Sequence, residues 1–133
     1  AVSFLRLVAS SDDEADGQVL GREVVDLTPA ERLARIDALY EETGAALAGE
    51  PVAHPVFQAF QAVAARHRLP PAFAFDHLHG FRLDAEGAGV RTYEDLLTYC
   101  YHVAGVVGVM MAWIMGVRDA PTLDRACDLG LAF

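Results

Sequence analysis

Residues 96–117 read LLTYCYHVAGVVGVMMAWIMGV, without one Asp, Glu, Lys or Arg side chain. The stretch could cross a bilayer, since a transmembrane helix needs about 20 apolar residues. However, residues 98–102 (TYCYH) make its first third amphipathic, and the strongly apolar part begins only at Val103. We therefore prefer a buried central helix and keep a transmembrane helix as the alternative.

Small side chains recur along this stretch at intervals of four residues, at Ala104, Gly108 and Ala112. This spacing places them on one face of a helix, where they form a shallow groove. Another backbone could approach such a groove closely, and a long apolar ligand could also lie in it. Tight packing between helices and ligand binding are therefore both open interpretations.

Two helices are predicted before this stretch. Residues 28–31 (TPAE) are typical of a helix start, because the threonine can cap the helix and the glutamate can reach back to it. The helix from about Pro29 should end at Gly49. Its buried stripe should contain Leu33, Ile36, Tyr40, Thr43 and Leu47. A second helix should begin at Pro55 and end before residues 69–71 (LPP).

Three further helices are predicted from Pro71 onward. A short helix over Ala72–Gly80 should be followed by a loop at residues 84–90 (DAEGAGV), and Thr92 should cap the central helix. Pro121 indicates the start of a last helix, predicted over Leu123–Phe133. The apolar positions of this helix continue to the final residue. We interpret this open end as the mark of a fragment.

These patterns predict an all-α helical bundle of five to six helices, with no sheet, in one domain over residues 1–133. The net charge of −9 argues against nucleic acid as a partner, since anionic surfaces repel each other. The sequence contains no lysine, which excludes a lysine Schiff base and a P-loop lysine. Cys100 and Cys127 stand far apart and suit reduced thiols, so we expect a cytoplasmic protein.

A candidate metal site lies in residues 12–16 (DDEAD). Asp12 and Asp16 are one helical turn apart and would project from the same face. Their mutual repulsion would be relieved by a hard divalent cation such as Mg²⁺, because such ions prefer carboxylate oxygens. A solvated acidic surface is the alternative, since charge runs are usually exposed.

Residues 99–108 (YCYHVAGVVG) resemble the central motif of the squalene and phytoene synthases, the head-to-head prenyl synthases. Residues 115–119 (MGVRD) and 124–133 (DRACDLGLAF) resemble the bacterial phytoene synthases of that family. Residues 12–21 (DDEADGQVLG) resemble its first aspartate-rich motif. The resemblance therefore extends over nearly the whole chain.

The resemblance implies an isoprenoid synthase bundle and a Mg²⁺-dependent prenyltransferase of carotenoid biosynthesis. Such an enzyme joins two geranylgeranyl diphosphates into phytoene through prephytoene diphosphate, so a prenyl diphosphate is the expected partner. Asp12 and Asp16 match the family's metal-binding positions, with Mn²⁺ as an alternative ion. Tyr99 matches the tyrosine beside the reacting centre, and all three residues are the expected catalytic set.

The same resemblance places the prenyl chain along the central helix. A dry apolar wall there would keep an allylic cation from water. The residues expected to line it are Val103, Ala104, Val107 and Gly108. Peripheral contact with a membrane is a further expectation, because substrate and product are apolar.

Two departures from the family pattern bear on activity. Ala9 stands where the family usually has an arginine, and the second aspartate-rich motif is absent from these residues. The sequence is therefore interpreted as part of an isoprenoid synthase domain, truncated at both ends and inactive alone. A squalene-type synthase acting on farnesyl diphosphate and a non-catalytic helical remnant of the family are the alternatives.

Overall fold

The computed structural model describes residues 27–87 and 89–132, and all regular structure in them is helical. The elements in chain order are α2 (Pro29–Ala48), α3 (Pro55–His67), α4 (Pro71–Glu86), α5 (Tyr93–Cys100), the π-helical turn η1 (Tyr101–Gly105), α6 (Val106–Ile114) and α7 (Ala120–Ala132). The elements α5, η1 and α6 follow one another without a break and form one rod. The predicted all-α fold is confirmed.

The first helix begins where the sequence places it. The Thr28 hydroxyl accepts a hydrogen bond from the Glu31 N–H at 3.3 Å, and the Glu31 carboxylate accepts the Thr28 N–H at 2.7 Å. These two bonds are the predicted capping box. The helix ends at Gly49, whose φ of 79° is a left-handed conformation that glycine adopts without strain. Thr92 and Asp95 form a second capping box at the start of α5.

Two predicted boundaries are wrong. Helix α4 does not end near Gly80 but continues to Glu86, so residues 84–86 are helical and not part of a loop. No residue among these three breaks a helix, and the chain turns only at Gly87, where φ is 63°. Helix α7 begins at Ala120 and not at Leu123, because the Asp119 carboxylate accepts the N–H of Thr122 at 3.0 Å.

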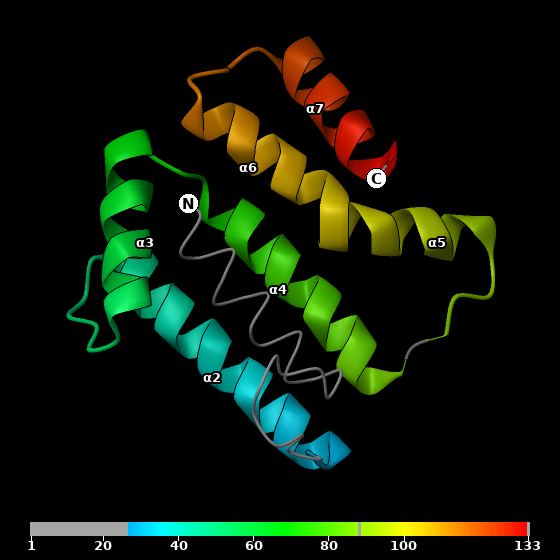
Figure 1. Cartoon of the computed structure of the whole chain (residues 1–133), viewed down its shortest axis with the longest axis horizontal. Coiled ribbons are helices and arrows are strands. Elements are labelled where there is room, and N and C mark those ends of the chain that lie inside the picture. Colours follow the sequence, from blue (N-terminus) through cyan, green and yellow to red (C-terminus); the bar gives the residue numbers. More distant parts are fainter. Residues whose placement is uncertain (1–26, 88, 133) are drawn as a thin grey trace, which may run out of the picture.

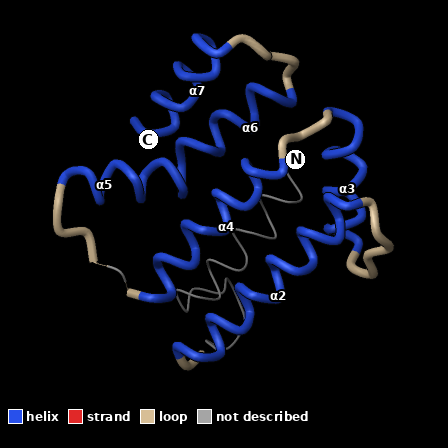
Figure 2. Tube along the Cα trace, turned by 180° about the vertical axis from the view of Figure 1, so that it is seen from behind, coloured by secondary structure: helices blue, strands red, loops and turns tan. Residues whose placement is uncertain are grey.

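Among the described helices, α2, α4, the rod and α7 lie side by side in one layer, and α3 crosses the end of α2. Figure 1 shows α2 beside α4, α4 beside the rod, and α7 along α6 on the side away from α4. The same order is visible from behind in Figure 2. The rod therefore contacts α4 on one side and α7 on the other.

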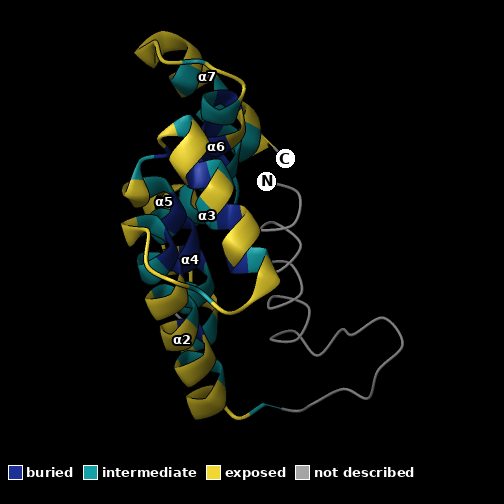
Figure 3. Cartoon of the chain, turned by 90° about the vertical axis from the view of Figure 1, so that its left-hand side faces the viewer, coloured by how far each residue is buried: buried dark blue, intermediate teal, exposed yellow. Residues whose placement is uncertain are grey.

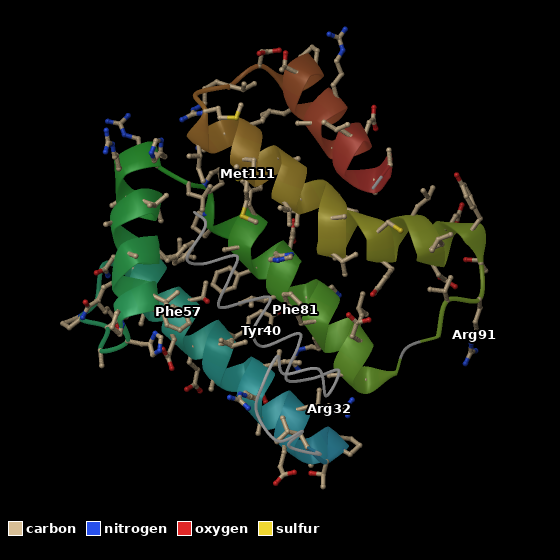
Figure 4. All side chains as sticks on the ribbon, viewed as in Figure 1. Arg32, Tyr40, Phe57, Phe81, Arg91 and Met111 are labelled. Atoms are coloured by element: carbon tan, nitrogen blue, oxygen red, sulfur yellow. The ribbon has the colours of Figure 1, made fainter. Side chains whose placement is uncertain are left out.

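The apolar core lies where α2, α3, α4 and α6 meet. Its buried members are Ala46, Phe57, Phe60, Ala64, Leu69, Ala74 and Met110. Figure 3 shows this burial concentrated inside the layer, and Figure 4 shows Tyr40 and Phe81 between α2 and α4. The Trp113 indole N–H donates to the His67 carbonyl at 3.0 Å and joins α6 to the end of α3. The guanidinium of Arg118 stacks over the Trp113 ring, 4.0 Å from its centroid.

The rod over Tyr93–Ile114 is, in the described ranges, the one helix long and apolar enough to cross a membrane. Its α6 half is packed, with Val106, Val109, Met110 and Ala112 buried. Its α5 half has no buried residue, and Leu96 and Leu97 are exposed. The predicted central helix is therefore buried only in part, along α6, and the choice between a buried helix and a transmembrane helix stays open.

Candidate functional site

An apolar pocket of about 500 Å³ lies between the rod and α7. It is lined by Val103, Ala104, Val107, Gly108, Met111, Ala112, Met115, Ala126, Leu129 and Gly130. The structure thus brings all four predicted lining residues together in one cavity. The lining carries no ionisable side chain, and the volume lies in the range typical of small-molecule sites.

Glycine at two positions lets α7 approach the rod closely. A Cβ added to Gly108 would overlap the Ala126 carbonyl oxygen, and one added to Gly130 would lie 2.6 Å from the Ala104 carbonyl oxygen. Such contacts leave no room for any larger residue. Tight helix packing is therefore found at Gly108, while Ala104 and Ala112 line the pocket and ligand binding there stays a prediction.

Large apolar side chains form the outer part of the pocket. Met111, Met115 and Leu129 are 38%, 75% and 62% exposed. Methionine has an unbranched and polarizable side chain that adapts to irregular apolar ligands. The pocket wall is therefore fixed by backbone contacts near Gly108 and adaptable at its methionine end.

The beginning of the wall, η1, is held by α4. The Tyr101 hydroxyl donates to the Asp76 carboxylate at 2.9 Å, and His102 Nδ1 lies 2.8 Å from the Asp76 carbonyl oxygen. His77 Nδ1 lies 3.0 Å from the His102 carbonyl oxygen. Each ring nitrogen faces a carbonyl, which only accepts, so each Nδ1 carries the hydrogen. These two histidines therefore hold η1 against α4.

The surroundings of Tyr101 and His77 determine the protonation state of each side chain at neutral pH. Burial, together with the hydrogen bond to Asp76 and the negative charge of its carboxylate, raises the pKa of Tyr101 to about 12. The Tyr101 hydroxyl therefore stays a donor at neutral pH. Burial lowers the pKa of His77, although its hydrogen bond to His102 opposes this effect. His77 is consequently neutral in the folded protein at neutral pH.

Tyr99 is half-buried near the end of α5 and does not line the pocket. It lies four residues before Val103, which does line it, and therefore about one helical turn away. Its place beside a reacting centre stays a prediction.

The predicted metal ligands Asp12 and Asp16 lie outside the described residues, as does Ala9. Within residues 27–87 and 89–132, no group of three or more His, Cys, Asp or Glu side chains could hold a metal ion. The magnesium site is thus a prediction from the sequence alone.

Sequence reasoning missed several residues of the site. Met111 and Met115 continue the four-residue spacing of Val103 and Val107, and this repeat could have identified them. The α7 residues Ala126, Leu129 and Gly130 carry no such signal, since only the packing of α7 brings them to the pocket.

The chain also matches known proteins. A sequence model of the squalene/phytoene synthase family matches residues 2–133. The chain belongs to this family. Two relatives from its phytoene synthase branch are the 15-cis-phytoene synthases of Pantoea ananas, 54% identical over 125 residues, and of Paracoccus sp. (strain N81106), 52% identical over 123 residues. Each alignment covers 92% of this chain and 40% of the relative.

A solved member of the squalene/phytoene synthase family has the same fold. The crystal structure of the squalene synthase HpnC from Alicyclobacillus acidocaldarius superimposes with a TM-score of 0.78 at 28% sequence identity. The match covers 98% of this chain and 45% of that protein. Of the two curated phytoene synthases, the chain spans about 40% of the length.

Proposed function

We propose that this chain belongs to a phytoene synthase. The enzyme would condense two geranylgeranyl diphosphates head to head, through prephytoene diphosphate, to phytoene in carotenoid biosynthesis. The observation that carries the proposal is the identity of 52–54% to curated phytoene synthases over 92% of the chain. The apolar pocket supports it, because every residue expected to contact a prenyl chain lines that pocket.

The pocket suits the chemistry of a prenyl chain. Loss of diphosphate leaves an allylic cation that water would quench, so the reacting carbons must lie against dry walls. Val103, Ala104 and Val107 would offer such a wall, since the pocket lining carries no ionisable side chain. Dispersion contacts with this wall would hold the isoprene units in place.

Tyr99 is proposed to act beside the reacting carbons. The face of its ring would stabilise a nearby carbocation, while its hydroxyl would orient the diphosphate. Its position one turn before Val103 is compatible with this role, because the cation forms at the diphosphate end of the prenyl chain.

Asp12 and Asp16 are proposed to hold Mg²⁺, with Mn²⁺ as the alternative. The donor set fits, because carboxylate oxygens are the ligands that such hard ions prefer. When bound, the metal would neutralise the diphosphate leaving group. The bound cation would also bridge the anionic substrate to a protein with a net charge of −9.

We further propose a cytoplasmic protein in peripheral contact with a membrane. The apolar substrate and product favour such contact, and the exposed side chains of Leu96 and Leu97 are compatible with it. The acidic net charge opposes binding to nucleic acid and to strongly anionic lipid.

Incubation of the full-length protein with geranylgeranyl diphosphate and Mg²⁺ tests the proposal. Phytoene is the expected product, and the absence of both phytoene and its cyclopropyl precursor would overturn the assignment. Farnesyl diphosphate in a parallel reaction tests the squalene-type alternative, which the fold shared with the squalene synthase HpnC favours. Loss of Mg²⁺-dependent diphosphate binding in the Asp12→Asn/Asp16→Asn double variant would argue against a non-catalytic remnant.

A further inference from the structure

The π-helical turn η1 changes the angular spacing of side chains around the axis of the rod at the start of the pocket. Pocket-lining side chains recur every four residues at Val103, Val107, Met111 and Met115, and Tyr99 precedes them at the same interval. A regular α-helix has 3.6 residues per turn, so residues four apart drift by about 40° at each step. A π turn, with hydrogen bonds from i to i+5, is wider and counters this drift. It would therefore keep Tyr99 closer to the line of the pocket wall than a regular α-helix would.

Helix α4 contacts three consecutive residues of this turn. Asp76 binds the Tyr101 hydroxyl through its carboxylate and His102 through its carbonyl. On the other flank, a Cβ added to Gly80 would lie 2.9 Å from Val103 Cγ1 and 3.2 Å from the His102 carbonyl carbon. Tyr101 and Val103 therefore both lie against α4, the first through Asp76 and the second beside Gly80. The position of Val103 in the pocket is thus set by α4, which does not line the pocket.

π turns are rare, and they occur frequently at functional sites. A polar bond to a carboxylate is among the stronger hydrogen bonds in proteins. We propose that Asp76, Tyr101 and Gly80 are positioning residues, which hold η1 so that Tyr99 and Val103 enclose the reactive end of the prenyl chain. This inference rests on the proposed function, and it assigns a role to residues that do not touch the substrate.

The test measures the ratio of prenyl alcohol to phytoene. A ratio of two products does not depend on the amount of folded enzyme. If the wall at η1 loosens, water adds to the allylic cation and releases a proton, which gives prenyl alcohol in place of phytoene. Tyr101→Phe in the full-length protein should raise the ratio of prenyl alcohol to phytoene roughly two- to tenfold, the range by which one hydrogen bond shifts an equilibrium. An unchanged ratio would overturn the proposal.

Tyr40→Phe is the matched control. Tyr40 also donates to a partner on α4, the Phe75 carbonyl oxygen at 3.4 Å, but it lies on α2. This variant should leave the ratio unchanged, and an equal rise in both variants would show a general packing effect and overturn the proposal. Asp76→Asn keeps an oxygen acceptor for Tyr101 and should restore most of the wild-type ratio that Asp76→Ala loses.

The Gly80→Ala variant approaches the same turn from the other flank. Its methyl group should push Val103 and raise the alcohol ratio, whereas Gly44→Ala, with its nearest neighbour at 3.9 Å, should not.

If the wild-type protein makes no phytoene, the proposed function fails independently of this inference. Hydrogen exchange then tests the turn alone: faster exchange at residues 101–105 in Tyr101→Phe than in Tyr40→Phe supports it, and equal exchange overturns it.

Discussion

Alanine at Gly108 should destabilise the protein, although alanine normally favours a helix. The new methyl group would meet the Ala126 carbonyl oxygen and, at 3.1 Å, its carbonyl carbon. Both are backbone atoms, which cannot turn aside as a flexible side chain can. Relief of the overlap therefore requires α7 to move away from the rod as a body.

The size of the effect follows from two opposing contributions. Overpacking of a close contact costs about 1–3 kcal/mol, and the upper end applies here because the neighbour is backbone. The gain in helix propensity from glycine to alanine returns about 1 kcal/mol. We therefore expect Gly108→Ala to lower the free energy of unfolding by about 2 kcal/mol.

Gly44→Ala is the matched comparison. Gly44 also lies inside a helix, α2, but its nearest neighbour would be Phe75 Cζ at 3.9 Å, an ordinary van der Waals distance. This variant should raise the free energy of unfolding by about 0.5–1 kcal/mol. Guanidinium denaturation of the full-length protein, followed by circular dichroism, measures both changes at a constant m value. If both substitutions stabilise the protein, the close approach of α7 at Gly108 is refuted.

Three further predictions concern capping and pH. Thr28→Ala should remove the capping box and lower the free energy of unfolding by about 1 kcal/mol in the same assay, whereas Thr28→Ser should not. Because burial lowers the pKa of His77 below 6.5, stability should be full above that pH and fall on acidification, with a weaker fall in His77→Gln; pH-dependent denaturation midpoints measure this. Because the pKa of Tyr101 is raised from 10.0 to about 12, stability should decline between these pH values, and alkaline melting of Tyr101→Phe should lack that decline.

The helix boundaries that could be predicted from the sequence are those set by local chemistry. The side chains of Thr28 and Glu31 each accept the backbone N–H of the other residue within one helical turn. The start of α2 therefore needs no tertiary contact. The predicted end of α4 at Gly80 is wrong, because this glycine provides space for η1 inside a continuing helix. A helical glycine signals close packing as readily as it signals an end.

The four wall residues on the rod could be predicted because the family motif and the four-residue spacing agree on them. The π turn could not, since no residue in Tyr101–Gly105 requires it and its support comes from Asp76, some 25 residues earlier. Contacts at that separation depend on how α4 crosses the rod. The predicted roles of Asp12, Asp16 and Tyr99 stay predictions.

The single-layer order of the helices bears on how the chain is made. In the described part, α4 pairs with α2, the rod then pairs with α4, and α7 pairs with the rod. Each segment leaving the ribosome thus finds its neighbour already synthesised, and short separations between partners favour rapid folding. Assembly can therefore proceed vectorially during translation, with α2 and α4 protected from proteolysis before α7 has emerged.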